Sequence, residues 1–130
     1  MTDKKLVLTT AGSKEEARKI ARALVERRLA ACVNVVPQIE SVYRWEEKVE
    51  EAQEWLLVIK TIGSAYERVR DAIKELHSYE VPECICISIE NGSPDYLKWI
   101  ADSVNKTSTF PAAFKIPDGD DGEGEPSPPA

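Results

Sequence analysis

Residues 32–61 constrain the fold more than any other part of the chain. They form two segments rich in valine, isoleucine, tyrosine and tryptophan, separated by a short link at residues 46–48. Such residues fit the pleated surface of a sheet, and a link of this length joins antiparallel strands. The pattern predicts a hairpin with strands of about 13 residues, each spanning about 40 Å.

A hairpin of this length should project beyond the domain that contains it. A compact domain of about 100 residues has a radius of gyration of only about 13 Å. An exposed, aromatic-rich hairpin promotes aggregation unless another surface covers it. The sequence therefore predicts an oligomer in which another copy of the chain covers the hairpin. Pro37, inside the first strand, predicts a bulge, a bend or an edge position there.

Two shorter strands and three helices are predicted around the hairpin. Residues 6–10 form a short apolar strand, and residues 83–90 alternate cysteine or serine with isoleucine. Apolar residues recur with helical spacing after Ser13, Ser64 and Ser93. The order β-α-β-β-α-β plus one helix predicts an α+β, ferredoxin-like subunit with helices on one face of an antiparallel sheet. Continuous apolar runs in the strands predict that a partner subunit covers the other face.

Two of the helices begin with a capping-box pattern. Ser13 precedes Glu16 by three residues, and Ser64 precedes Glu67 by three. In this motif the serine oxygen accepts a hydrogen bond from a backbone N–H, and the glutamate reaches back to the N–H of the serine. We expect both pairs to fix the first turns of their helices.

Length, charge and cysteine content limit the classes of function. The 130 residues have a net charge of −6, which argues against a nucleic-acid partner because such partners require a basic face. Neither a membrane-spanning segment nor a signal peptide is evident, so no membrane partner is expected. Three cysteines without a disulfide-rich pattern predict a reduced, cytoplasmic protein. We expect one domain at residues 1–104 and a flexible Pro/Gly/acidic tail at residues 105–130.

Few side chains offer chemistry, and none belongs to a recognised catalytic motif. His77, the single histidine, is either a favourable cation at a helix C-terminus or a metal ligand or proton shuttle. Cys84 and Cys86 lie on one face of a strand, where core packing is favoured over a structural zinc site. Cys32 is expected in the core as well. An enzyme is therefore the least supported class of function.

Five segments of the chain read AACVN, SVYRW, LLVIKT, HSYEVPE and YLKWI. In their order and spacing they resemble the CutA family of divalent-cation tolerance proteins. The resemblance covers about residues 5–104 and implies a ferredoxin-like subunit and a tight homotrimer whose hairpins pack into neighbouring subunits. It also implies a link to tolerance of copper or other divalent metals, a fold shared with the PII signalling proteins, and no required cofactor.

The resemblance also implies a metal site. The motif histidine corresponds to His77, whereas Thr9 and Leu76 stand where some bacterial relatives have a cysteine and a second histidine as proposed copper ligands. A divalent metal such as copper or zinc would then need His77 together with acids such as Glu80 or Glu83, or residues of another subunit. Oxygen-rich ligation of this kind favours harder ions than Cu(I).

We expect a cleft between subunits that contains Lys60, which either solvates a strand end or contacts an anion there. Aromatic residues of the hairpin favour interface packing over stacking on a ligand. The first hypothesis is a homotrimer that binds a divalent metal weakly at this cleft. The alternatives are a PII-like sensor for a small anion or a partner protein, and a scaffold with no metal role. The residues expected at the cleft are Tyr43, Trp45, Lys60, Tyr79 and Glu80.

Overall fold

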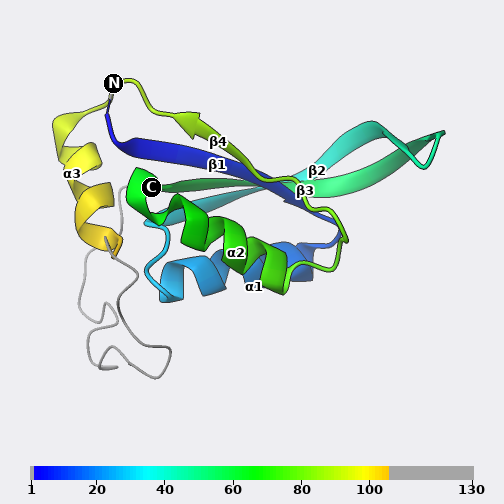
Figure 1. The fold of residues 1–130 in the computed structure, drawn as a ribbon, viewed down its shortest axis with the longest axis horizontal. Coiled ribbons are helices and arrows are strands. Elements are labelled where there is room, and N and C mark those ends of the chain that lie inside the picture. Colours follow the sequence, from blue (N-terminus) through cyan, green and yellow to red (C-terminus); the bar gives the residue numbers. More distant parts are fainter. Residues whose placement is uncertain (1, 106–130) are drawn as a thin grey trace.

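The computed structural model describes residues 2–105 and shows a four-stranded antiparallel sheet with two helices across one face (Figure 1). The strand order is β2-β3-β1-β4, which confirms the predicted α+β, ferredoxin-like fold. The predicted tail, apart from residue 105, lies outside the described residues. The elements are β1 (Lys4–Ala11), α1 (Lys14–Glu26), β2 (Cys32–Trp45), β3 (Lys48–Ile62), a 3-10 helix η1 (Gly63–Ala65), α2 (Tyr66–Leu76), β4 (Ile85–Ser88) and α3 (Pro94–Ser103).

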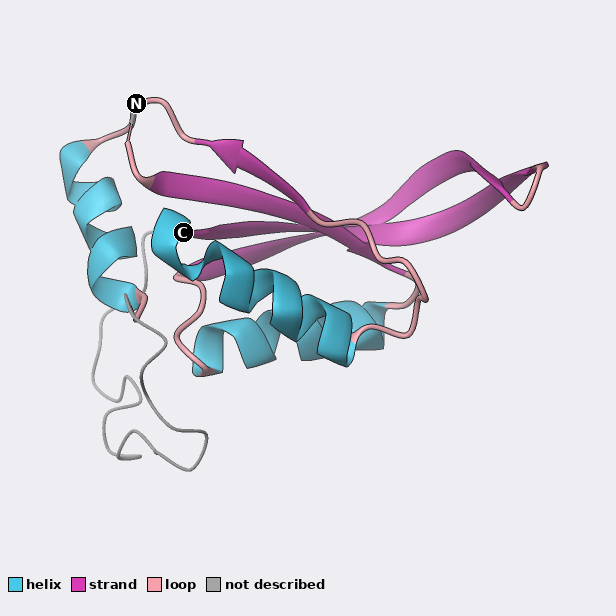
Figure 2. Cartoon of the chain, viewed as in Figure 1, coloured by secondary structure: helices cyan, strands magenta, loops and turns pink. Residues whose placement is uncertain are grey.

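The main core lies between the sheet and the helices α1 and α2 (Figure 2). The apolar stripes of the two helices face the central strands, as their spacing predicts. Helix α3 packs instead against the end of β3, in a second cluster around Ile62 and Ile100. Side chains at the centre of the main core include Val7, Ile20, Leu24, Leu57, Ile59, Val69 and Ile73.

The hairpin β2–β3 projects beyond the helices, as predicted (Figure 1). Pairing between β1 and β3 ends where Ala11 stands opposite Trp55. From there to the tip the two strands pair only with each other. Tyr43 and Trp45, near the tip, are 44% and 43% exposed in the single chain.

Two irregularities shape the hairpin. A shift of register at Pro37 confirms the predicted bulge, and Gln38 next to it has a φ of 59°. At the tip, Glu46 and Glu47 form a two-residue turn with φ of 50° and 69°. Positive φ at both positions is characteristic of a type I′ turn. Asn and Gly usually mark such turns, so the glutamates gave no signal for it, and Lys48 belongs to the strand.

The second face of the sheet, which we call the open face, is apolar and lies opposite α1 and α2. Paired residues of neighbouring strands point to the same side of a sheet. Leu6 pairs with Lys60 and Ile87, and Leu8 pairs with Val58 and Ile85, which places these side chains on one face. Ile85 and Ile87 are 48% and 43% exposed. The open face consists of Leu6, Leu8, Cys32, Asn34, Val36, Leu56, Val58, Lys60, Ile85 and Ile87.

Two local predictions differ from the structure. The predicted capping box at Ser64 is wrong, because a 3-10 helix occupies residues 63–65 and α2 starts only at Tyr66, without a side-chain cap. The last strand is shorter than predicted, since β4 makes only four register pairs with β1 and is an edge strand. The cap of α3 is confirmed, because Ser93 Oγ accepts a hydrogen bond from the N–H of Tyr96.

Candidate functional site

The loop after α2 brings His77 to the end of β1. The side chain of His77 is fully buried. Its Nε2–H donates to the carbonyl of Thr10 at 2.5 Å, and its Nδ1 accepts from the N–H of Tyr79 at 3.1 Å. Pairing of β1 with β4 ends at Leu8, so the imidazole takes the place of a β4 partner for Thr10, which still pairs with Leu56 of β3. Both ring nitrogens are used, and the two bonds define the neutral tautomer with the proton on Nε2.

Glu16 holds the same loop from the side of α1. Its carboxylate accepts from the N–H of Ser78 at 2.6 Å and from the Oγ–H of Ser78 at 3.0 Å. The distance from Glu16 to His77 Nδ1 is 3.7 Å, too long for a hydrogen bond. Ser13 does accept from the N–H of Glu16 at 3.1 Å. The serine half of the first capping box is therefore confirmed, whereas the glutamate contacts the loop instead of the helix start.

Tyr79 joins the loop to the base of the projecting hairpin. Its hydroxyl donates to Glu54 Oε2 at 2.6 Å, and its ring centre lies 4.6 Å from that of His77. Glu54 is only 6% exposed. A Cβ atom at Gly12 would lie 2.9 Å from the Tyr79 hydroxyl oxygen, so glycine leaves the space that the phenol occupies.

The environment of Tyr79 favours its neutral form. Burial raises the pKa of Tyr79 most strongly, followed by the hydrogen bond to Glu54, and the nearby Tyr43 adds to the shift. The folded chain then holds the phenolic proton more tightly than the unfolded chain, in which the pKa is about 10. Stability is full below that pH and falls as the pH rises above it.

As the pH rises from about 9 to about 11, the free energy of unfolding is expected to fall less in a Tyr79→Phe variant than in the wild type. The reason is that it lacks the phenol whose ionisation opposes folding. Urea unfolding at several pH values measures the difference. The hydrogen bond with Cys84 also raises the pKa of Tyr66, but less than burial raises that of Tyr79, so Tyr66→Phe should show the same effect more weakly. Equal slopes for wild type and Tyr79→Phe would contradict this role of Tyr79.

Lys60 lies apart from this loop. It donates to Asn34 Oδ1, and its Nζ is 3.9 Å from Cys32 Sγ on the open face. Glu54 precedes Lys60 by six residues on β3, which is about 20 Å along a strand. Within one chain, Lys60 and Tyr79 therefore do not share a cleft. Glu80 is exposed beside Tyr79; whether a second chain unites these residues stays a prediction.

The three free cysteines differ in their surroundings. Cys84 is partly buried and packs against the main core, which agrees with the prediction. Cys32 is half-buried on the open face rather than in the core. The core prediction for Cys86 is wrong, because Cys86 is exposed. The physical reason is its place on β4, a short strand at the edge of the sheet.

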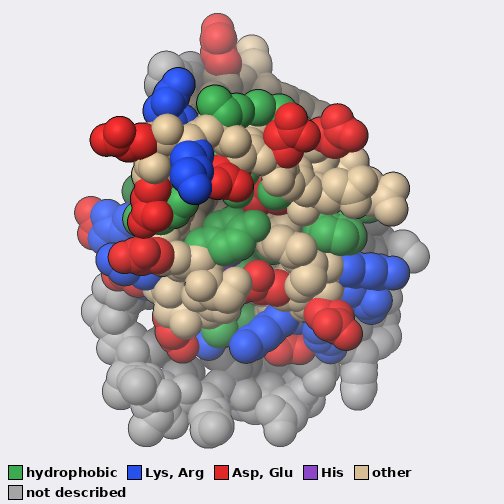
Figure 3. Space-filling model, turned by 90° about the vertical axis from the view of Figure 1, so that its right-hand side faces the viewer, with side chains coloured by type: hydrophobic (Ala, Val, Ile, Leu, Met, Phe, Trp, Pro, Cys, Tyr) green, Lys and Arg blue, Asp and Glu red, His purple; other side chains and the backbone are tan. Residues whose placement is uncertain are grey.

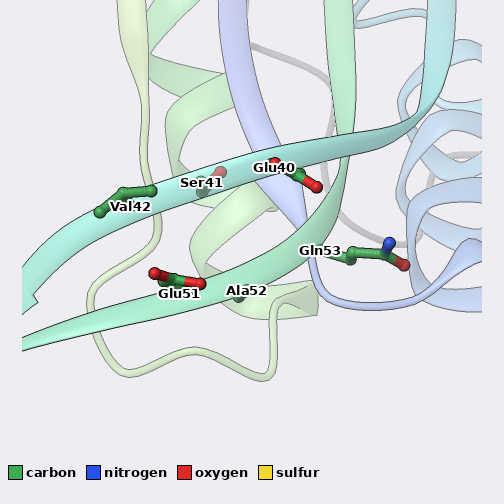
Figure 4. Close-up of a pocket in the computed structure, with 6 residues that line it drawn as sticks. All are labelled: Glu40, Ser41, Val42, Glu51, Ala52 and Gln53. Carbon is green, nitrogen blue, oxygen red and sulfur yellow. The ribbon is translucent and has the colours of Figure 1, made fainter.

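A shallow hollow of about 260 Å³ lies on the hairpin itself (Figure 4). It lies between the two strands, and its lining is largely polar or acidic. The lining residues are Glu40, Ser41, Val42, Glu51, Ala52 and Gln53.

Figure 3 views the end where the hairpin projects and shows hydrophobic side chains among both acidic and basic ones. This side of the molecule is therefore not a basic surface.

The described residues do not present a preformed metal centre. Among residues 2–105, no three His, Cys, Asp or Glu side chains are grouped so that they could hold a metal ion. His77 would have to give up one of its two hydrogen bonds before it could ligate a metal. Metal ligation by His77 stays a prediction.

Comparison with known proteins identifies the family. The model of the CutA1 divalent ion tolerance protein family matches residues 5–103. This chain belongs to the CutA1 family. It is 48% identical over 98 residues to the divalent-cation tolerance protein CutA of Thermus thermophilus, covering 75% of this chain and 95% of the relative. It is 53% identical over 88 residues to the CutA homolog of Xenopus laevis, covering 68% of this chain and 58% of the relative.

Solved CutA1 structures share the fold of this family member. The structure of the Thermus thermophilus protein aligns with a TM-score of 0.77 at 46% identity and covers 78% of this chain and 99% of its own. The Thermus thermophilus protein is named as a tolerance protein and not for a catalysed reaction. Within the described part of the chain, no helix is long and apolar enough to cross a membrane.

The predicted cytoplasmic location needs correction. A CutA structure from Archaeoglobus fulgidus is described as periplasmic, and a CutA protein of Arabidopsis thaliana as chloroplastic. Members of the CutA1 family thus occur in different compartments. A low number of cysteines reflects redox conditions only loosely, and it does not fix the compartment of a CutA1 protein.

Proposed function

We propose that three copies of this chain form a homotrimer that serves in tolerance to divalent cations and binds a divalent ion weakly near the clefts between subunits. Membership of the CutA1 family supports the tolerance role. The apolar open face of the sheet is the observation that supports the assembly best.

The open face needs a cover that the described residues of one chain do not supply. Ile85 and Ile87 are about half exposed, and they continue the apolar surface formed by Leu8 and Val58. Soluble monomers rarely expose large contiguous apolar patches. The projecting hairpin is exposed as well, with Tyr43 near its tip. Further copies of the chain, which bring the same apolar surfaces, can cover both features at once.

The proposed ion, copper or zinc, would be bound by His77 with the acids Glu80 or Glu83. Because the His77 ring is held by Thr10 and Tyr79, binding requires the loss of one hydrogen bond. A bond of this kind contributes about 1 kcal/mol net, which weakens binding about fivefold. The geometry of His77 thus supports weak binding rather than a tight, preformed site.

The test combines light scattering with calorimetric titration of Zn(II), Cu(II) and Ni(II). We expect the mass of a trimer and a heat of binding that is lost in His77→Gln and reduced in Glu80→Gln. Glutamine can still donate to the carbonyl of Thr10 but lacks the imidazole. A double variant, Cys84→Ser with Cys86→Ser, should keep the heat, which separates this site from the thiols.

The two parts of the proposal fail separately. A trimer with no His77-dependent heat at millimolar metal would remove the metal site and keep the assembly. A monomeric wild type would remove the assembly, whatever the metal titration shows.

A PII-like sensor for a small anion is the second candidate. Lys60 is half-buried on the open face, with its Nζ bonded to Asn34 and close to the thiol of Cys32. No carboxylate among the described residues forms an ion pair with Lys60. A trimer without a metal heat would favour this function, since a cation without an acidic partner at a subunit boundary can hold an anion.

A further inference from the structure

Two free thiols lie close together at the edge of the sheet. Cys86 is exposed and pairs with Val7, whose side chain lies in the main core, so Cys86 points to the face covered by α1 and α2. Cys84 packs against the same core just before β4. Both thiols therefore lie on one side of the edge, next to α2, and Cys86 is open to solvent.

Helix α2 adds a phenol and a cation beside these thiols. The hydroxyl oxygen of Tyr66 lies 3.7 Å from Cys84 Sγ, and the guanidinium carbon of Arg70 lies 6.0 Å from the centre of the Tyr66 ring. The pKa of the Cys84 thiol is raised, mainly by burial; the hydrogen bond with Tyr66 and the charge of Arg70 oppose the shift, and Cys86 adds to it. The thiols and the cation are thus close enough to influence one another.

We propose that Cys84 and Cys86 bind one Cu(I) ion as a pair of thiolates. Thiolates are soft ligands that select Cu(I), zinc and iron–sulfur clusters. Structural zinc takes four ligands, and the described residues offer no third His, Cys, Asp or Glu in a common group with this pair. Cu(I), by contrast, accepts two sulfur ligands in a linear arrangement. A two-thiol site therefore suits Cu(I) better than zinc.

Binding of Cu(I) involves no change of oxidation state. Each thiol loses one proton and forms one bond to copper, so two protons are released for each ion. The product, a copper ion with two thiolates, has one negative charge. Arg70, which lowers the pKa of Cys84 and also forms an ion pair with Asp71, offsets part of this charge.

This site goes beyond the proposed function. It uses sulfur in place of oxygen and nitrogen, takes a monovalent ion, and requires neither His77 nor assembly into a trimer. Failure of the divalent site therefore says nothing about the thiol pair, and the reverse also holds.

The test is an anaerobic titration with Cu(I), kept reduced by ascorbate, in competition with a chromophoric Cu(I) chelator. Wild type is expected to bind one ion per chain at the pair. Cys86→Ser and Cys84→Ser are each expected to lose more than about 100-fold in affinity, because loss of a ligand exceeds the effect of an outer-shell change. Cys32→Ser, which removes the third thiol, should bind as wild type does.

X-ray absorption of the copper complex gives a second readout, with two sulfur neighbours expected. Cys86 is exposed, so Cys86→Ser should fold normally, and circular dichroism checks Cys84→Ser. Unchanged affinity in Cys86→Ser would overturn the proposal. An equal loss in Cys32→Ser, or nitrogen and oxygen neighbours in the absorption spectrum, would do so as well.

Discussion

Replacement of Ile87 by lysine is expected to convert the assembly into monomers at concentrations where the wild type is trimeric. Ile87 lies on the open face and is 43% exposed in one chain. If neighbouring copies cover this face, the new ammonium group becomes buried without a partner, which costs several kcal/mol for each copy. Light scattering or sedimentation at a fixed chain concentration measures the change.

Val25→Lys is the matched control for this variant. Val25 is 41% exposed, almost the same as Ile87, but it lies on α1 and not on the open face. This variant is expected to keep the mass of the wild type. Retention of that mass by Ile87→Lys as well would show that the open face is not the surface that joins the subunits.

Replacement of His77 by alanine is expected to lower the free energy of unfolding by about 2–4 kcal/mol. The change leaves a cavity and deprives the carbonyl of Thr10 and the N–H of Tyr79 of their partners. Urea unfolding at constant chain concentration measures the loss, since stability of an oligomer depends on concentration.

Ser78→Ala provides the comparison for His77→Ala. Ser78 is exposed, and its hydroxyl bonds to Glu16 at the surface. Loss of this bond is expected to cost less than about 1 kcal/mol. A cost for His77→Ala as small as that for Ser78→Ala would contradict the view that the imidazole fixes the loop to β1.

Most of the fold could be predicted from local patterns. The valine-rich and aromatic segments predict the hairpin, Pro37 predicts its bulge, and helical spacing predicts all three helices. The capping box predicted at Ser64 is wrong because this Ser-x-x-Glu pattern begins in a 3-10 helix that precedes α2. The prediction for Cys86 is wrong because a cysteine indicates burial only on average, and all four residues of the edge strand β4 are exposed.

The site could be predicted only in part. His77 and Tyr79 stand out as residue types, but their partners come from elements far away in the sequence. Thr10 contributes a backbone carbonyl, which no sequence pattern reveals. Glu16 fits a capping box equally well, and only the folded chain shows that its carboxylate binds Ser78. The sequence thus shows which side chains are able to bind or react, whereas their hydrogen-bond partners are set by tertiary contacts.

The bulge at Pro37 determines to which side of the hairpin its aromatic side chains point. On β2, even-numbered residues such as Asn34 lie on the open face before the bulge. The extra residue reverses this alternation, so that Tyr43 and Trp45, opposite Glu50 and Lys48, continue the open face along the projecting arm. Without that one residue, both rings would turn to the opposite side. The insertion thus places the aromatic rings of the arm on the same side as the apolar surface of the sheet, so that one partner surface can contact both.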